Sequence, residues 1–145
     1  MATVKESKVI PYSVEEFFAL IADVAAYPDF LPWCLESTVK PIKENEFLGK
    51  MTVGSGFLKE SYESHVYLFP NESVLSISQD GPFKNLRSEW KLKPLPEGGC
   101  FVECQVDFEF RSIILGKMAG GLFAENSRKM IDAFLNRAEE KYGKR

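Results

Sequence analysis

The sequence predicts a two-layer α+β fold in which a curved antiparallel sheet grips a long C-terminal helix. Three features point to this fold. Apolar and polar residues alternate through much of residues 35–110, which is typical of strands with one apolar and one wet face. Residues 112–142 contain no proline and place apolar side chains at three- and four-residue steps, as an amphipathic helix does. Two shorter helical patterns follow the first predicted strand.

The N-terminal region predicts a strand and two short helices. We expect the strand at residues 3–10, the first helix at residues 14–22 and the second at residues 24–27. Ser13 and Glu16 have the spacing of a capping box, and Ser13 is a favourable N-cap. Asp23 is expected to cap the second helix. Pro28 and Pro32 then break regular structure.

Further strands are predicted from residue 35 onward. They are expected at residues 35–40, 46–53, 58–68, 74–79, 86–93 and 100–110, with a turn at residues 54–56. Leu35 and Val39 share one face of the first of these strands. The alternation puts Glu60 on the apolar face of its strand and His65 on the wet face.

The last element is expected to be one continuous helix over residues 112–142, about 45 Å long. Its apolar face consists of Leu115, Met118, Ala119, Leu122, Phe123, Met130, Phe134 and Ala138. Ala119, Gly120 and Gly121 are small where a packed core would favour larger side chains, and Asn126 falls on the apolar face. Two interpretations remain open. The helix packs closely on the sheet with Asn126 bonded to local backbone, or the small residues widen a pocket and Asn126 offers it a polar contact.

The widths of the two layers favour an enclosed space. Six strands make a sheet wider than one helix of about 10 Å can cover. The sheet must therefore curl round the helix and leave a gap, which we expect to be a ligand cavity of several hundred cubic ångströms with room for a long apolar chain.

Composition limits the classes of function. A length of 145 residues predicts a single domain over residues 1–145. A net charge of −3 disfavours DNA and broad nucleic-acid binding. We find no signal peptide, no long apolar run and few cysteines, so we expect a soluble cytoplasmic protein whose membrane contact, at the inner membrane, is peripheral.

Residues suited to catalysis are few. His65 is the only histidine, and three dispersed cysteines do not have the spacing of a metal site, so we predict neither a catalytic residue nor a metal or cofactor. Cys34 is interpreted as a small buried apolar residue. Candidate polar groups of a pocket are Glu60, Ser64, Ser88 and Asn126. The loops at residues 30–33 and 80–83 are interpreted either as ordinary packed loops or as a gate that touches a membrane surface or an apolar partner.

Three motifs resemble a known family. They are Tyr27-Pro28-x-Phe30-Leu31-Pro32-Trp33-Cys34, then Asp80-Gly81-Pro82-Phe83-Lys84-x-Leu86 with Trp90, and then Phe108-Glu109-Phe110-Arg111-Ser112. In this order they resemble the coenzyme-Q-binding START-like proteins and, similarly, the bacterial RatA ribosome-association toxins. The resemblance implies a START/Bet v 1-like helix-grip fold and a cavity for ubiquinone or another polyprenyl lipid. It also implies a carrier that supports respiration and quinone biosynthesis, not an enzyme.

The predicted ligand-binding residues combine these motifs with the apolar faces. They are Phe30, Pro32, Trp33, Glu60, Tyr62, Phe83, Ser88, Trp90, Phe108, Met118, Gly120, Leu122, Phe123 and Asn126. Two alternatives remain. One is a RatA-like toxin that binds the 50S ribosomal subunit and blocks 70S association, which the basic end of the last helix favours. The other is a polyketide cyclase/dehydrase, since START-like domains include such enzymes.

Overall fold

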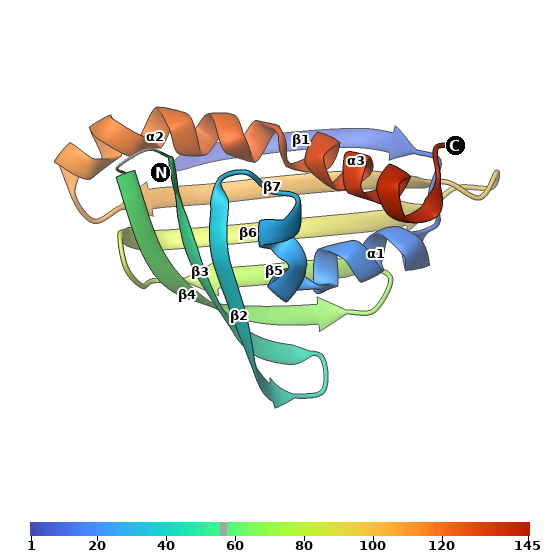
Figure 1. Cartoon of the computed structure of the whole chain (residues 1–145), viewed down its shortest axis with the longest axis horizontal. Coiled ribbons are helices and arrows are strands. Elements are labelled where there is room, and N and C mark those ends of the chain that lie inside the picture. Colours follow the sequence, from blue (N-terminus) through green and yellow to red (C-terminus); the bar gives the residue numbers. More distant parts are fainter. Residues whose placement is uncertain (56–57) are drawn as a thin grey trace.

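A seven-stranded antiparallel sheet forms one layer of the protein. In the computed structural model, which describes residues 1–55 and 58–145, the strand order is β1-β7-β6-β5-β4-β3-β2. The strands are β1 (Ala2–Ile10), β2 (Cys34–Lys43), β3 (Glu46–Ser55), β4 (Leu58–Phe69), β5 (Ser73–Ser78), β6 (Phe83–Pro94) and β7 (Cys100–Phe110). Strands β2–β4 rise steeply across the direction of β5–β7, so the sheet is strongly curved (Figure 1). The predicted curved antiparallel sheet is confirmed.

The connection from β1 to β2 contains the two predicted helical segments. Helix α1 (Val14–Ala22) begins in a complete capping box, because the Ser13 hydroxyl accepts from the Glu16 backbone N–H at 3.1 Å and the Glu16 carboxylate accepts from the Ser13 N–H at 3.1 Å. The second segment is a 3₁₀ helix, η1 (Val24–Asp29), which includes Pro28. Asp23 precedes it, but its side chain makes no capping hydrogen bond, so that part of the prediction is wrong.

The C-terminal segment is two helices instead of the single helix predicted. Helix α2 (Ile113–Arg128) and helix α3 (Met130–Tyr142) meet at Lys129 and follow one another along the sheet with a bend between them (Figure 1). The Ser127 hydroxyl donates to the Phe123 carbonyl at 2.8 Å, a contact that bends helices by competing for the carbonyl. The Lys129 N–H then reaches back to the Asn126 carbonyl at 3.1 Å, which tightens the turn.

The sheet's free edge at β2 departs from the sequence expectation. Leu35 and Val39 are exposed, and the strand that carries them, β2, has a neighbouring strand on one side only. At the end of β3, Gly54 and Ser55 belong to the strand and not to a turn, while the rest of the predicted turn lies outside the described residues. Alternation alone cannot distinguish an edge strand from a central one.

The packed core lies where α1, η1 and α3 cover the sheet. Phe134 of α3 is fully buried, with its ring centroid 4.9 Å from that of Phe30, 5.0 Å from that of Trp90 and 5.2 Å from that of Tyr27. All three contacts are edge-to-face, a geometry that aromatic quadrupoles favour. Here the two layers are closely packed. Helix α2, in contrast, extends beyond this cluster.

Candidate ligand-binding cavity

An apolar cavity of about 160 Å³ separates α2 from the sheet. Lining residues on the sheet floor, such as Val66 and Val106, are buried, whereas Gly54, Leu58 and Leu122 are partly exposed. The first two of these three residues lie at the ends of β3 and β4, and the third lies on α2. We therefore place the opening of the cavity between α2 and these strand ends.

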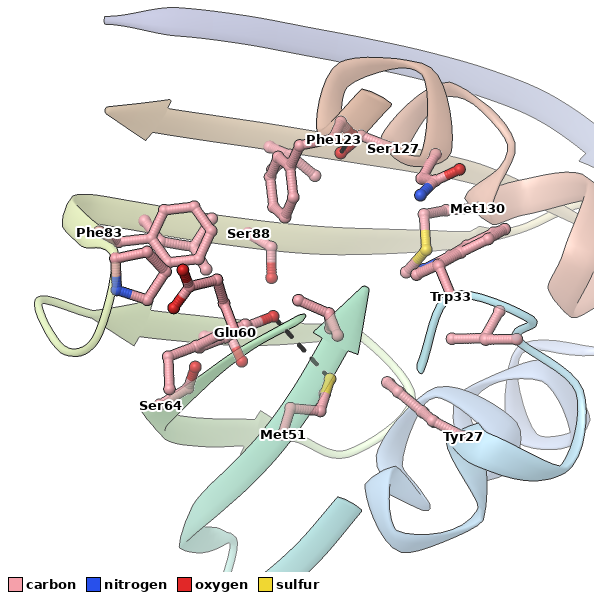
Figure 2. Close-up of a pocket in the computed structure, with 18 of the residues that line it drawn as sticks. Tyr27, Trp33, Met51, Glu60, Ser64, Phe83, Ser88, Phe123, Ser127 and Met130 are labelled. Atoms are coloured by element: carbon pink, nitrogen blue, oxygen red, sulfur yellow. Dashed lines mark hydrogen bonds between the residues drawn. The ribbon is translucent and has the colours of Figure 1, made fainter. Parts of the chain in front are cut away.

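The wall of the cavity is largely aliphatic and aromatic. Trp33, Phe83 and Phe123 stand on different sides of the space, and Met51 and Met130 face it as well (Figure 2). The flexible thioethers of methionine adapt to ligands of varied shape. An apolar wall of this kind favours a ligand with much hydrocarbon surface, because each Å² removed from water contributes about 25 cal/mol.

Besides Ser127, whose hydroxyl donates to the Phe123 carbonyl, five polar side chains without an aromatic ring interrupt this apolar wall: Glu60 and Ser64 on β4, Ser76 on β5, Ser88 on β6 and Asn126 on α2. Figure 2 shows Glu60 and Ser88 with their polar ends turned into the space between helix and sheet. Within residues 1–55 and 58–145, none of the five side chains has a hydrogen-bonding partner in the protein. Their polar atoms keep access to the cavity, where they can meet water or a ligand.

The two tyrosines of the wall differ from these five groups. The Tyr27 hydroxyl donates to the Ile21 carbonyl, and the Tyr62 hydroxyl lies 3.9 Å from the Met51 sulfur (Figure 2). Burial is the main cause that raises the pKa of both phenols above the ordinary value. Both tyrosines therefore remain neutral, and Tyr27 acts as a fixed part of the wall.

The loop at residues 80–83 is firmly held. The Asp80 carboxylate accepts from the Glu63 backbone N–H at 2.8 Å, and the Arg111 guanidinium donates to the carbonyls of Gly81 and Gln79. Gly81 has φ +59°, and a Cβ there would lie 2.2 Å from the Ser61 carbonyl oxygen, so only glycine fits. Phe83 is buried behind this turn. Ordinary loop packing, the first of the two interpretations, describes the loop.

The side chains of the loop at residues 30–33 lie partly in the packed core and partly in the cavity wall. Phe30 packs on Phe134 and lies under the Arg137 guanidinium, 5.3 Å from its ring centroid. Pro32 is exposed, whereas Leu31 and Trp33 line the cavity. This loop therefore supplies one aromatic side chain to the wall.

Most of the predicted ligand-binding residues lie around the cavity. Those that line it are Trp33, Glu60, Tyr62, Phe83, Ser88, Trp90, Leu122, Phe123 and Asn126. Phe30, Pro32, Phe108, Met118 and Gly120 do not line it. Phe108 lies behind Phe123, with ring centroids 4.8 Å apart, and Met118 faces outward from α2. Contact of any of these residues with a ligand stays a prediction.

The glycines of α2 do not widen the cavity. A Cβ on Gly120 would contact the Phe110 ring at 3.9 Å, which is an ordinary packing distance, and one on Gly121 would meet nothing within 4 Å. Gly120 therefore lies against β7, in agreement with close helix–sheet packing, and Gly121 lies on the outer surface. Ala119 is the small residue of this group that faces the cavity.

Several lining residues are absent from the predicted ligand-binding set. Leu115 and Met130 were placed on the apolar face of the last helix but not in that set, whereas Met51 and Val53 on β3, Ser76 on β5, Phe110 on β7 and Ser127 on α2 were missed. Parity along β5 would have placed Ser76 beside Val74 on the apolar face. The remaining residues depend on where the curved sheet approaches α2, which a pattern along one strand does not specify.

The other candidates for chemistry lie away from the cavity or are held neutral. His65 is on the outer face, as predicted, where its Nε2 lies 2.7 Å from a Glu46 carboxylate oxygen. Burial raises the pKa of the thiols of Cys34 and Cys100 to about 11 and that of Cys104 to about 12, so all three behave as apolar side chains. In the described part of the chain, no group of three or more His, Cys, Asp and Glu residues is placed to hold a metal ion.

The cavity is smaller than the sequence led us to expect. Ligand pockets commonly measure about 300–1,000 Å³, and a cavity near 150 Å³ is enough for a benzene ring. With about 160 Å³, the space between α2 and the sheet accommodates one ring-sized group. A long isoprenoid chain does not fit inside and would have to leave through the opening.

None of the helices described here is long and apolar enough to cross a bilayer.

Similar proteins share the whole length of the chain. A RatA ribosome association toxin from Vibrio cholerae is 36% identical over 143 residues, covering 99% of both chains. The mitochondrial coenzyme Q-binding protein COQ10 homolog B from Xenopus laevis is 32% identical over 143 residues, which are 96% of this chain and 59% of that protein.

Solved structures and a family model agree on the fold. The Zhui aromatase/cyclase from Streptomyces sp. R1128 superposes with a TM-score of 0.84 at 17% identity, covering 97% of this chain and 94% of the other. A START superfamily protein from Mycobacterium smegmatis gives a TM-score of 0.80 at 18% identity, covering 95% and 97%. The model for polyketide cyclase/dehydrase and lipid transport proteins matches residues 10–135. The chain therefore belongs to that family and has its START/Bet v 1-like helix-grip fold.

Proposed function

We propose that this protein carries a lipid whose polar ring enters the cavity, most simply ubiquinone or another polyprenyl quinone. The structural observation on which this proposal depends is the set of five polar side chains without protein partners in an otherwise apolar wall. A pure hydrocarbon ligand would displace their water and leave each group unpaired, at a cost of about 1–3 kcal/mol. A ligand with oxygen substituents on a ring avoids that cost.

A quinone ring suits the groups that the wall offers. Its carbonyl oxygens can accept from the hydroxyls of Ser64, Ser76 and Ser88 and from the Asn126 amide. The Glu60 carboxylate can accept from a ring hydroxyl of the reduced form. The cavity volume is close to the roughly 150 Å³ that suits one unsubstituted ring, and the isoprenoid chain would pass out between α2 and the ends of β3 and β4.

We propose a carrier role in respiration and quinone biosynthesis without a chemical step. The likeness to the protein named as coenzyme Q-binding supports a quinone ligand. Glu60 is the one carboxylate among the described residues of the wall, and His65 lies on the outer face. The likeness to the Streptomyces cyclase, at 17% identity, concerns the fold alone.

Intrinsic fluorescence gives a direct test. The chain has two tryptophans, Trp33 and Trp90, and both line the cavity. Titration with a short-chain ubiquinone should quench their emission to saturation, and mass spectrometry of a solvent extract of the purified protein should find a co-purified quinone. Absence of both saturable quenching and co-purified quinone would contradict the proposal.

A variant pair tests the polar groups. Ser88→Ala removes one hydroxyl from the wall and should weaken quinone affinity roughly two- to tenfold, the effect of one lost hydrogen bond. Ser7→Ala, on the exposed side of β1, is the matched control and should leave the affinity unchanged. Equal affinities for the two variants would remove Ser88 from the binding site.

Ribosome association is the second candidate function. The 36% identity to a RatA toxin over 99% of both chains favours it. Charge weighs against it, because Arg137 lies 3.8 Å from Asp29 and Arg145 lies 2.6 Å from Glu16, which reduces the positive charge available to RNA phosphates. Sedimentation with 50S subunits at physiological salt distinguishes the two functions, since the carrier should not co-migrate.

A further inference from the structure

The outward side of helix α2 carries large apolar side chains. Ile113 is 80% exposed, Ile114 72%, Met118 55% and Leu122 38%. Residues 114, 118 and 122 follow one another at four-residue steps, so they form a stripe of about 12 Å along the helix. Contiguous apolar surface of this kind marks a contact site more often than scattered single residues do. We call Ile113, Ile114, Met118 and Leu122 the α2 stripe.

The α2 stripe adjoins the cavity opening. Leu122 belongs to both, because it lines the cavity and is exposed. Leu115 and Ala119, each one position after a stripe residue, face the cavity. A ligand chain that leaves the cavity beside α2 therefore emerges next to the stripe.

The segment that carries the stripe is positively charged. Residues 111–124 contain Arg111 and Lys117 and no acidic residue, in a chain whose net charge is −3. Among the described residues, neither cation forms an ion pair. The nearest acidic residue along α2 is Glu125, which lies 3.2 Å from Lys129. An apolar stripe with Arg111 and Lys117 beside it, whose nearest acidic neighbour along α2 is paired with Lys129, is complementary to the surface of an anionic bilayer.

We infer that the α2 stripe docks on an anionic lipid bilayer, so that the cavity opening faces the source of the ligand. This inference rests on the proposed carrier function and names the surface through which it works. It locates the membrane contact on α2 instead of the loops at residues 30–33 and 80–83, whose aromatic side chains Phe30 and Phe83 pack inward. Nucleic acid fits less well, because phosphate contacts require cations where the stripe has isoleucine, methionine and leucine.

The test is co-sedimentation of the full chain with vesicles of equal parts phosphatidylcholine and phosphatidylglycerol. The affinity of the double variant Ile114→Glu/Met118→Glu for these vesicles should be lower than that of the unchanged protein by a factor of about ten or more. The control Val9→Glu/Ile77→Glu adds the same charge at exposed apolar positions of the sheet and should bind as the unchanged protein does. Lys117→Gln should weaken binding about fivefold on these vesicles and leave binding to pure phosphatidylcholine unchanged.

Each outcome decides for or against the inference. Selective loss of vesicle binding in the stripe variant supports it. Equal loss in both double variants, or no vesicle binding by the unchanged protein, overturns it. It is also overturned if the stripe variant instead dissociates a dimer in analytical ultracentrifugation, or loses 50S co-sedimentation in the absence of vesicle binding, because the stripe would then contact protein or ribosome.

Soluble-ligand binding separates this inference from the carrier proposal. Ile114 and Met118 do not line the cavity, so their variant should still bind a short-chain ubiquinone in the tryptophan quenching assay. If the unchanged protein binds the quinone but not the vesicles, the docking inference alone is wrong. If it does not bind the quinone, the carrier proposal itself is wrong.

Discussion

The two consecutive C-terminal helices cover the sheet in different ways. Helix α3 buries Ile131, Phe134 and Ala138 against the sheet and α1. Helix α2 buries only Ser127 among its described residues, spans the cavity, and turns the α2 stripe to solvent. One end of the molecule is a packed aromatic core, and the other is a hollow with apolar walls.

This difference indicates a division of roles along one helical segment. Close packing of large side chains supplies most of the stability of a domain, whereas a cavity forgoes those contacts. The α3 end can therefore hold the fold while the α2 end stays open for a ligand. The predictions below test whether stability and binding separate in this way.

The largest effect is expected at the packed end. Phe134→Ala removes a fully buried ring from contact with Phe30, Tyr27 and Trp90 and should lower the free energy of unfolding by about 3–5 kcal/mol. Met118→Ala, on the exposed side of α2, should change it by about 0.5 kcal/mol or less. Urea denaturation measures both. Similar losses of unfolding free energy for the two variants would contradict the difference in packing between the α3 end and the α2 end.

The next effect concerns binding at the hollow end. Ala119→Leu adds bulk to the cavity wall, while leucine keeps good helix propensity. Quinone affinity in the quenching assay should fall about tenfold, or 1.4 kcal/mol, with little loss of stability. Unchanged affinity would show that the ligand does not use the space beside Ala119.

A smaller gain in stability is expected from the outer surface of α2. Gly121 lies in the helix, and a Cβ there would meet no other atom within 4 Å. Gly121→Ala should therefore raise the free energy of unfolding by about 0.5–1 kcal/mol, because alanine favours helix, and should leave quinone affinity unchanged. A fall in affinity would indicate that the ligand crosses this surface.

The smallest effect is expected from the ion pair that joins α1 to the C-terminus. Arg145 is the main cause that lowers the pKa of Glu16 from its usual value near 4.5 to about 2. Because the folded-state pKa is depressed, the stabilisation is complete above pH 4.5 and is lost as the pH falls towards 2. Glu16→Gln keeps the capping box but removes the charge, so its stability should depend less on pH in this window. Thermal unfolding of the unchanged protein and of Glu16→Gln between pH 2 and 4.5 measures how the stability of each depends on pH. The same pH dependence in both proteins would contradict this prediction.

Local patterns predicted most of the elements. The capping box at Ser13, the alternation along β6 and β7, and the parity of Glu60 were read correctly, because hydrogen-bonding rules and side-chain periodicity act within a few residues. The break at Lys129 was missed, since the hydrogen bond from Ser127 to Phe123 is one of several that this side chain could make.

The class of fold, the order of the elements, the resemblance to START-like proteins and most of the cavity's aromatic lining could be predicted from the residues alone. The size of the cavity, the contact of Gly120 with Phe110 and the exposure of Met118 became apparent only from the folded chain. These features depend on how far the sheet curves and where α2 bends. Curvature and bending arise from contacts between residues distant in the chain, so no periodicity along the chain records them.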